Sequence, residues 1–425
     1  MNTSPIPADK SKLYLGLDFG TGGARASLID EEGTEAFQTG VAFQDNTWQE
    51  WLVALRHLFA AIPTELRGCI KSIAFCGTSS TSLLCDKSGQ PLLPALLYDD
   101  NRAQAEVSRI PPDSIAANAS SSLAKLLWFL KRPESVAAHY FMHQADWLAF
   151  QLHGVPGISD YHNSLKLGYD IGVLAYPEWL AQADFSRLLP RILEPGVAIG
   201  CITPAAASTF ALPPDCIVRA GTTDSIAAFF ASGASAPGQA VTSLGSTMVL
   251  KLLSQTRVEF PDYGIYSHRC GNFWLAGGAS NCGGRVLKQL FGRERLRELS
   301  MSIDADKPTG LDYYPLPAPG ERFPVNDPAL LPRLTPRPES DTEYLQGLLE
   351  SLARIEAQGY QLLEQFGASP LREVFTAGGG ASNTAWTAIR ARQLGVPVCS
   401  AEHTEAAYGA ARLAKSGEKL LYSTS

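Results

Sequence analysis

The sequence predicts an α/β protein, because short strands, glycine-containing turns and helices alternate along its 425 residues. Three stretches carry this prediction: residues 13–30, 216–254 and 373–400. The first alternates apolar residues, breaks at a cluster of glycines and resumes the alternation, which indicates a strand, a turn and a second strand. The other two add a helical pattern after a strand and a glycine-containing loop, which is the order expected of α/β units.

The elements of the N-terminal half follow from hydrophobic periodicity. LYLGLDFG and ARASLID predict a β-hairpin over residues 13–30, with Asp18 at the end of its first strand. Apolar residues at helical spacing predict a helix over residues 48–61. Residues 72–100 predict further strands joined by loops of small residues, and residues 119–153 predict helical structure.

The C-terminal half shows the same mixture. We expect a strand, a GTTD loop and a helix, then a strand–turn–strand, a long amphipathic helix, a strand–loop–helix–strand unit and a last helix, over residues 216–233, 241–254, 343–365, 373–400 and 404–415. The proline-rich residues 303–340 predict mostly loop. LDFGTGGARASL and TSLGSTMVLKLL are weakly similar, so a duplicated domain and a coincidence both remain open.

Composition limits the classes of function. Apolar residues make up 45% of the chain and charged residues 18%, which is typical of a soluble globular protein of two or three domains. A net charge of -7 argues against a nucleic-acid scaffold, and no apolar run approaches the ~20 residues needed to span a bilayer. Eight cysteines without metal-site spacing predict reduced thiols in a cytoplasmic protein. The polar residues 1–11 predict a disordered tail without the apolar core of a signal peptide.

The turn of the opening hairpin has the chemistry of a phosphate loop. Its glycines let a ligand approach the backbone N–H groups, while Thr21 adds a hydroxyl and Arg25 a positive charge. Asp18 would repel a bare phosphate, so it fits such a loop only with a cation, and Mg²⁺ held through water is the natural choice. An ordinary tight turn with a solvated aspartate is the alternative. The protein-kinase Asp-Phe-Gly motif is excluded, because only 17 residues precede Asp18.

Two further loops and one carboxylate offer related chemistry. Gly245-Ser246-Thr247 has the same donors without an aspartate, although it could be a simple turn. Gly378-Gly379-Gly380 comes before a helix, whose N-terminus favours an anion or a polar nucleotide edge, although it could be a flexible connection. Asp224 follows a strand at the start of a helix, where it could cap the helix or act as a general base on a hydroxyl nucleophile.

Taken together, these motifs resemble the FGGY carbohydrate kinases of the actin-like ATPase superfamily. The resemblance rests on DxGTxxxRxxxxD, the later GTTD, the Gly-Ser-Thr hairpin and GGGASNTAWTAIRARQLGVPV, and it covers about residues 12–415. It implies two actin-like (ribonuclease H-like) α/β domains, each with a mixed five-stranded sheet flanked by helices, with a nucleotide cleft between them. We therefore expect an N-terminal domain over residues 12–220 for the sugar and the first phosphate loop. A C-terminal domain over residues 221–425 would hold the catalytic base, the second phosphate loop and the adenosine pocket.

The resemblance also implies roles for individual residues. Asp18 resembles the magnesium-associated aspartate that also touches the sugar, Ser79 a sugar-contacting serine, and Asp224 the catalytic base that also contacts the substrate. The positions that resemble the ATP-binding residues of the family are Thr21, Gly22, Arg25, Gly245, Ser246, Thr247, Gly379, Gly380 and Asn383. ATP and Mg²⁺ are the expected cofactors, and a monomer or homodimer acting on a small sugar, with no nucleic acid or membrane partner, is the expected form.

The sugar-side segments indicate the substrate. GTSST, SDYHN and AGTTDSIAAF are similar to those of D-ribulose kinases of cyanobacteria and plants, which would also permit a plastid location. Gly77-Thr78-Ser79-Ser80-Thr81 replaces the Gly-Gln-Met-His-Gly of xylulose kinases, and Gly22 stands where many members have Ser or Thr. We expect a ketopentose kinase that forms D-ribulose 5-phosphate, with another sugar or polyol kinase, an actin-like ATPase and a non-catalytic regulator as alternatives. The roles of His162, Asn163, Asp100 and Arg102 stay open.

Overall fold

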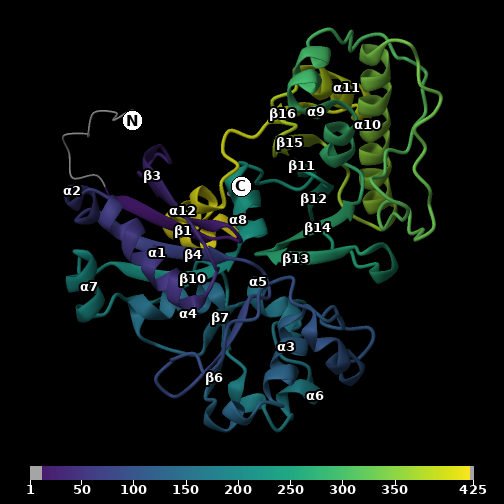
Figure 1. Cartoon of the computed structure of the whole chain (residues 1–425). Coiled ribbons are helices and arrows are strands. Elements are labelled where there is room, and N and C mark those ends of the chain that lie inside the picture. The colour runs from purple at the N-terminus through teal and green to yellow at the C-terminus, as the bar shows by residue number, and fades with distance from the viewer. Residues whose placement is uncertain (1–11, 422–425) are drawn as a thin grey trace. The chain divides into compact units, whose positions relative to one another are not determined.

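The computed structural model describes residues 12–421, so the predicted tail lies outside the described residues. The chain divides into two compact units (Figure 1). The described part of the first unit comprises residues 12–231 and 405–421, and the second unit is Ser232–Thr404. The first unit therefore ends at residue 231 rather than at the expected residue 220. It also includes the C-terminal helix, which was expected in the second domain.

The first unit is built on a six-stranded mixed sheet. Its strand order is β3-β2-β1-β4-β10-β9. The strands are β1 (Leu13–Phe19), β2 (Gly23–Ile29), β3 (Glu35–Ala42), β4 (Ile70–Gly77), β9 (Ala198–Cys201) and β10 (Ile217–Thr223). Strands β1, β4 and β10 run parallel, while β2, β3 and β9 pair antiparallel to their neighbours. Two small two-stranded sheets pair β5 (Ser82–Cys85) with β6 (Tyr140–His143) and β7 (Ile158–Asp160) with β8 (Arg191–Leu193).

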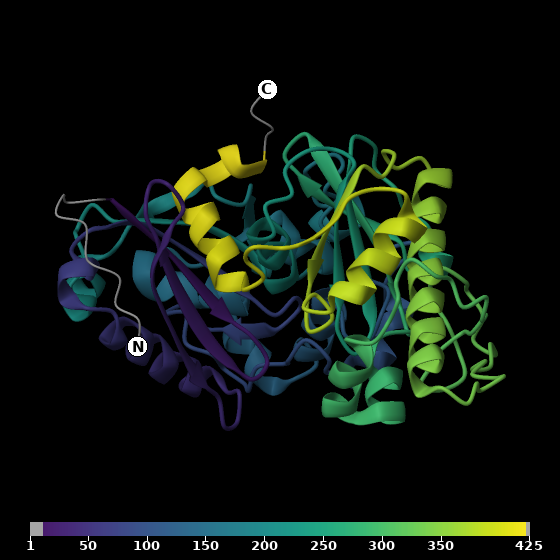
Figure 2. The same ribbon diagram turned by 90° about the horizontal axis from the view of Figure 1, so that it is seen from above.

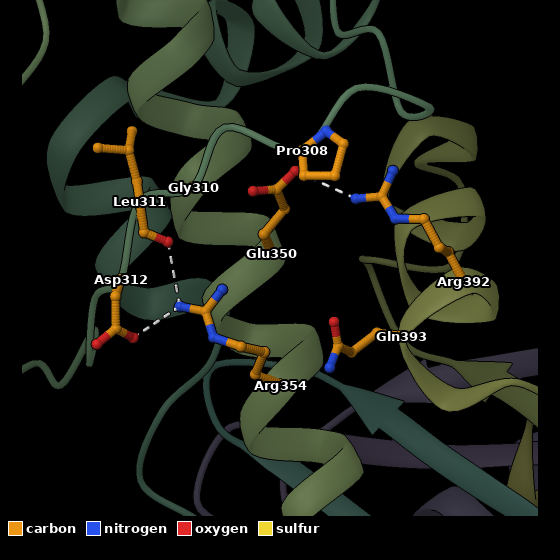
Figure 3. A pocket seen from close by; sticks show the side chains of 8 residues that line it. All are labelled: Pro308, Gly310, Leu311, Asp312, Glu350, Arg354, Arg392 and Gln393. Carbon is orange, nitrogen blue, oxygen red and sulfur yellow. Dashed lines mark hydrogen bonds and ion pairs between the residues drawn. The ribbon is translucent and has the colours of Figure 1, made fainter.

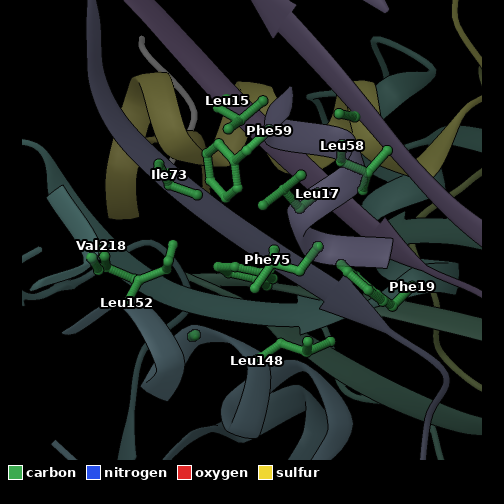
Figure 4. Packing of buried hydrophobic residues seen from close by; sticks show 14 of the residues in the cluster. Leu15, Leu17, Phe19, Leu58, Phe59, Ile73, Phe75, Leu148, Leu152 and Val218 are labelled. Carbon is green, nitrogen blue, oxygen red and sulfur yellow. The ribbon is translucent and has the colours of Figure 1, made fainter. Parts of the chain in front are cut away.

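Helices cover this sheet and enclose its core. They are α1 (Trp48–Ala61), α2 (Thr64–Arg67), α3 (Ser122–Phe129), α4 (Gln144–His153), α5 (Tyr161–Ser164), α6 (Glu178–Ala181), α7 (Pro204–Phe210), α8 (Asp224–Ala231) and α12 (Ala406–Ser416). Figure 4 shows side chains of β1 and β4, such as Leu17 and Phe75, packed against Phe59 of α1 and Leu148 of α4. All four are at most 1% exposed, so this apolar layer holds the strand ends in place.

Close packing of α8 on α12 explains why both helices belong to the first unit. Gly409 of α12 lies so near α8 that an added Cβ would fall 1.7 Å from the carbonyl oxygen of Ala227. Gly16 of β1 makes a similar approach to α12, where an added Cβ would lie 2.0 Å from the carbonyl oxygen of Ala407. Two glycines thus let α12 pack against the sheet and α8 at backbone distance.

The second unit also has a six-stranded mixed sheet, in the order β13-β14-β12-β11-β15-β16. Its strands are β11 (Gln239–Leu244), β12 (Met248–Ser254), β13 (Tyr266–Cys270), β14 (Phe273–Ser280), β15 (Glu373–Ala377) and β16 (Val398–Ser400). Its helices are α9 (Gly284–Ser300), α10 (Asp341–Gln365) and α11 (Thr384–Leu394). In Figure 2 the long helix α10 and helix α11 lie beside the sheet of this unit.

The predicted α/β class is confirmed, but each sheet has six strands rather than five. In each sheet three neighbouring strands pair antiparallel, β3-β2-β1 and β14-β12-β11, and the last of the three pairs in parallel with the next strand, which suits the duplicated-domain interpretation. The helical prediction for residues 119–153 was wrong in its middle, where β6 separates α3 from α4 because it pairs with β5. Periodicity did not identify β3, β13, β14 or α9.

Candidate active site

One group of predicted site residues lies in the first unit, where β1, β4 and β10 end side by side. Asp18 of β1 is the register partner of Cys76 of β4, and Cys76 is the partner of Thr222 of β10. Asp224 comes directly after the last residue of β10 and is the first residue of α8. Because parallel strands end at the same edge of a sheet, the two aspartates predicted to act on substrate share this edge.

Asp18 is a buried carboxylate with an unusual environment. It is 4% exposed, and the Sγ atom of Cys76 lies 3.4 Å from its Oδ1 atom. Burial, together with the nearby charge of Asp224, raises the pKa of Asp18 from 3.8 to about 7. The Nη1 atom of Arg25 lies 3.9 Å from Oδ2, but this guanidinium is exposed and lowers the pKa only in part. Two neighbouring carboxylates favour the binding of a cation beside them.

The opening hairpin turn presents exposed backbone and side chains. The N–H of Gly20 donates to the carbonyl of Gly23 over 3.0 Å, which closes the turn, and Thr21, Gly22 and Arg25 are exposed. A Cβ added to Gly22 would meet no atom within 4 Å, whereas one added to Gly23 would lie 2.4 Å from a carbonyl oxygen. The turn therefore has open space on the side of Gly22, where a ligand could approach the backbone.

Asp224 is half-buried at the start of α8. Its Oδ1 atom accepts a hydrogen bond from the N–H of Ser225 over 2.6 Å, so the carboxylate lies against the first turn of the helix. Its charge raises the pKa of Asp18, as described above, and it partly offsets the lowering of the Lys166 pKa that burial causes. Lys166 is thus a cation near Asp224 that the motif did not indicate.

The loop after β4 contains Ser79 and is held from several sides. Gln144 Oε1 accepts from the N–H of Thr78 over 3.1 Å, and Lys125 Nζ donates to the carbonyls of Ser80 (2.9 Å) and Leu97 (2.6 Å). Burial lowers the pKa of Lys125 to about 7. Ser79 itself is half-exposed at the tip of the loop, while its neighbours are buried. The loop is therefore rigid, with Ser79 available to a ligand.

Several buried polar atoms near these strand ends have no hydrogen-bond partner. They are Oγ of Ser80, Nε2 of Gln144, Oδ1 of Asn163 and Oγ1 of Thr223. A buried polar group without a partner is costly, so such groups point to a ligand that completes them. Donors and acceptors in one place suit a molecule rich in hydroxyl groups. Sequence motifs did not single out Gln144, Lys125 or Lys166, which come from helical segments with no motif of their own.

The residues whose roles were left open make polar contacts within the first unit. His162 Nδ1 lies 2.7 Å from Thr222 Oγ1, which ties α5 to the end of β10. Asn163 Nδ2 donates to Asp160 over 2.6 Å. Asp160 is fully buried, and burial with the charge of Asp146 raises its pKa to about 8. Asp100 and Arg102 form an ion pair of 2.8 Å.

A second group of predicted site residues lies in the second unit, at the ends of β11 and β15. Gly245, Ser246 and Thr247 form the turn between β11 and β12, and Gly245 and Ser246 are exposed. The N–H of Gly284, at the start of α9, donates to the carbonyl of Gly245 over 2.9 Å. The paired glycines 283 and 284 allow this approach, and the letters CGGR before a helix were the signal that sequence reasoning missed.

The triple glycine lies against the same turn. Gly380 N–H donates to the carbonyl of Leu244 over 3.2 Å, and Gly378 has a φ of +83° with its Cα packed on Leu244. Gly379 is exposed, with no atom within 4 Å of an added Cβ. The structure therefore brings the Ser246 turn and the Gly379 loop together in one place.

Asn383 has a structural task at this site. Its Oδ1 atom accepts from the N–H of Trp386 over 3.0 Å and so caps α11, while Nδ2 donates to Ser300 Oγ of α9 over 2.9 Å. Both ends of the amide are thus engaged. The Nε1 atom of Trp386, one turn into α11, is a buried donor without a partner beside Gly380.

Each unit thus holds half of the predicted residues. The first contains Asp18, Thr21, Gly22, Arg25, Ser79 and Asp224, and the second contains Gly245, Ser246, Thr247, Gly379, Gly380 and Asn383. Within residues 12–421, no cluster of three or more His, Cys, Asp or Glu side chains could hold a metal, and no helix is long and apolar enough to cross a membrane. All eight cysteines are free of disulfides.

A cavity of about 310 Å³ in the second unit contains none of the predicted residues (Figure 3). It lies between α10, α11 and the loop before α10, and its charged side chains are Asp312, Glu350, Arg354 and Arg392. Arg354 donates to Asp312 over 2.9 Å and Arg392 to Glu350 over 3.2 Å, so these charges are paired.

Comparison with known proteins shows the family of the chain. Residues 13–231 match the N-terminal domain, and residues 240–417 the C-terminal domain, of the FGGY family of carbohydrate kinases. The chain is 26% identical to a xylulose kinase of Klebsiella pneumoniae over 442 residues, covering 95% of this chain and 89% of that protein. It is 25% identical to an L-fuculokinase of Escherichia coli (strain K12) over 460 residues, covering 95% and 92%.

A solved structure shows the same fold. The crystal structure of a xylulose kinase from Brucella ovis superposes with a TM-score of 0.84 at 26% identity, covering 96% of this chain and 90% of that one. Matches to both domains of one family span nearly the whole chain. The protein therefore belongs to the FGGY family of carbohydrate kinases and is a sugar kinase.

Proposed function

We propose that the protein transfers the γ-phosphoryl group of ATP to a ketopentose, and that the substrate is D-ribulose, which becomes D-ribulose 5-phosphate. The observation that carries the proposal is the pair Asp18 and Asp224 at neighbouring strand ends, among buried polar atoms that lack partners. A hydroxyl-rich ligand would complete those atoms. D-Xylulose is the alternative, because relatives named xylulose kinase are similar over nearly the whole chain.

Asp224 would act as the general base. Its carboxylate would take the proton of the terminal hydroxyl as that oxygen bonds to the γ-phosphorus, and the bond from phosphorus to the bridging oxygen of ADP would break. Its carboxylate is half-buried at the start of α8, and the contact with Ser225 fixes its orientation. Lys166 is a nearby cation whose charge interacts with that of Asp224.

Each of the two hairpin turns has the chemistry to bind phosphates of ATP. The exposed N–H groups and hydroxyls of Thr21 and Ser246 are donors of the kind that phosphate oxygens accept. FGGY kinases use ATP, and bound Mg²⁺ would neutralise phosphate charge. Asp18 would hold the ion together with phosphate oxygens and water. The buried carboxylate beside Asp224 fits this use, because a cation would offset both the burial and the repulsion that raise its pKa.

The choice between D-ribulose and D-xylulose depends on one carbon, since the two sugars are C3 epimers. The loop of residues 78–81 supports D-ribulose through its small hydroxyl side chains and the unpartnered Oγ of Ser80. A site that hydrogen-bonds a substrate hydroxyl discriminates strongly against an analogue that misplaces it. We therefore expect one epimer to be clearly preferred.

The test measures ADP release with Mg·ATP and a panel of acceptors: D-ribulose, L-ribulose, D-xylulose, ribitol, glycerol and no acceptor. Stimulation by D-ribulose above all others, abolished in Asp224→Ala, is the expected result. Preference for D-xylulose would replace the substrate and keep the mechanism. Equal ADP release with and without every acceptor would contradict the proposal and favour an ATPase.

A further inference from the structure

The second unit contains a buried polar network directly beneath the Ser246 turn and the Gly379 loop. Its centre is Arg390 of α11, which is 0% exposed. Arg390 Nε and Nη2 donate to the two carboxylate oxygens of Glu356 of α10, each over 2.6 Å, and Nη1 donates to Thr376 Oγ1 of β15, also over 2.6 Å. This fork geometry fixes the guanidinium in two directions.

The network continues into the neighbouring strand. Thr242 of β11 donates from Oγ1 to Glu356 Oε1 over 2.6 Å, and the hydroxyl of Tyr360 lies 2.7 Å from the same Oγ1 atom. Thr242 and Thr376 are register partners in the parallel pair of β11 and β15. Four elements, α10, α11, β11 and β15, are thus joined by one set of charged hydrogen bonds.

These elements are the ones that carry the nucleotide half-site. Thr242 lies three residues before Gly245, and Thr376 lies two residues before Gly378. Arg390 lies two helical turns along α11 from its N-cap Asn383. The network is therefore attached to both strands that end in the loops and to the helix that begins after them.

Stability alone is a poor explanation for such a network. A buried ion pair loses hydration that its mutual attraction does little more than offset, and apolar side chains of similar volume often stabilise a core equally well. What a bidentate, fully buried pair adds is a defined geometry. Here it fixes β11, β15 and α11 relative to one another, and with them the separation of their loops.

We propose that Arg390, Glu356, Thr242 and Thr376 are positioning residues that set the affinity of this unit for the nucleotide. They act through β11, β15 and α11, which hold the Ser246 turn, the Gly379 loop and the Asn383 cap. The inference rests on the proposed assignment of ATP to these loops.

The chain offers a matched control on the same two helices. Glu350 of α10 is also a buried carboxylate paired with an arginine of α11, Arg392 (Figure 3). Its carboxylate accepts hydrogen bonds from Thr309 Oγ1 (2.7 Å), Gln346 Nε2 and Arg392 Nη2, and Arg392 also donates to the carbonyl of Ala305. None of these partners belongs to β11 or β15. The control pair joins α10 and α11 without reaching the strands.

The experiment compares the full-length protein with Thr376→Val, Thr376→Ser, Arg390→Lys and Glu350→Gln. Calorimetry with Mg·ADP gives nucleotide affinity, steady-state kinetics gives KM for ATP, KM for the sugar and kcat, and thermal unfolding gives Tm. We expect Thr376→Val to weaken ADP binding and raise KM for ATP by about fivefold or more, the scale of one lost hydrogen bond to a charged group. KM for the sugar should stay within twofold, and Thr376→Ser, which keeps the hydroxyl, should restore ADP affinity.

The control decides between positioning and general stability. Glu350→Gln should lower Tm without changing ADP affinity. Normal ADP affinity in Thr376→Val despite a lower Tm would overturn the inference, as would equal weakening in Glu350→Gln. Arg390→Lys should behave as Thr376→Val, and if it does not fold, Thr376→Val still decides. A wild-type protein that binds no ADP would overturn the proposed function itself. A change in Thr376→Val alone bears only on the positioning inference.

Discussion

The two opening hairpins share a backbone plan and differ in charge. In the first unit, β1 and β2 pair antiparallel, and β1 pairs in parallel with β4. In the second, β11 and β12 pair antiparallel, and β11 pairs in parallel with β15. The first hairpin has a buried aspartate, Asp18, near its turn, whereas the second ends β11 with Ser243 and Leu244 and has no carboxylate there.

Under the proposed function, this difference gives the two units different roles. The first unit gathers Asp18 and Asp224 and leaves polar atoms unpartnered, which suits proton transfer and a hydroxylated ligand. The second unit pairs its buried charges, Arg390 and Glu356, and presents neutral donors at its loops. Variants in the two units should therefore fail in different ways.

The largest effect is expected at Asp224. Asp224→Ala should lower kcat at least ~100-fold, the usual scale for loss of a general base, because Asp224 is the only carboxylate of α8. Mg·ADP affinity should remain near that of the wild type. Steady-state kinetics and calorimetry measure the two quantities. Turnover within a few-fold of the wild type would remove Asp224 from this role.

Asp18→Asn should reduce activity and increase stability above neutral pH. Removing the charge should cost at least about tenfold in kcat/KM, the scale of a charged contact. The folded protein binds a proton at Asp18 up to pH about 7, whereas the usual value is 3.8, so its stabilising contribution is lost as pH rises through 7. Asp18→Asn has no carboxyl group to ionise, so the variant does not lose stability in this way.

The check is thermal unfolding of the metal-free and nucleotide-free protein at pH 5 and pH 8. Relative to the wild type, Asp18→Asn should gain at least about 2 °C at pH 8 over any gain at pH 5, the shift that roughly 1 kcal/mol produces in a domain of this size. Cys85→Ala, which changes a buried residue of β5 away from Asp18, provides the control. A pH-independent difference would contradict the raised pKa.

Ser246→Ala tests the neutral hairpin. Loss of a hydroxyl donor to a phosphate should raise KM for ATP about tenfold, while KM for the sugar changes little. Ser246 is exposed, so Tm should be unaffected. An equal rise in KM for the sugar and in KM for ATP would contradict separate roles for the two hairpins.

Gly22→Thr should give the smallest effect and in the opposite direction. A side chain fits there, because an added Cβ meets no atom within 4 Å, and a hydroxyl would add one donor to the first turn. We expect KM for ATP to fall about two- to fivefold, the range of a single hydrogen bond. Gly23→Thr is the contrasting control, since its Cβ would lie 2.4 Å from a carbonyl oxygen. A higher KM in Gly22→Thr would show that the turn needs glycine.

Predictability varied along the fold for physical reasons. The helix α1 and the hairpin β1–β2 were predicted correctly, because one apolar face gives each a clear period. The strand β6 was missed, since its residues follow helical patterning and only pairing with β5 makes them a strand. The sixth strand of each sheet, at β9 and β13, is an edge strand with little apolar pattern of its own.

For the site, motifs located the loops, and the structure grouped them. Asp18, Ser79 and Asp224 were named from short motifs, as were Ser246 and Gly379. Lys166 and Gln144 were not, because each comes from a segment that reaches the strand ends only through folding. The division into units also moved Asp224 to the same side as Asp18, since α8 packs on α12.

The sequence by itself determined the α/β class, the family and the residues able to bind phosphate or take a proton, because these depend on local periodicity and on short motifs. Only the tertiary structure decided which of them share an environment. The raised pKa of Asp18 comes from its burial and from the charge of Asp224, 206 positions away, and buried Arg390 is paired with Glu356 and Thr376 from other elements. Burial and charge coupling depend on distance in space, which no local pattern contains.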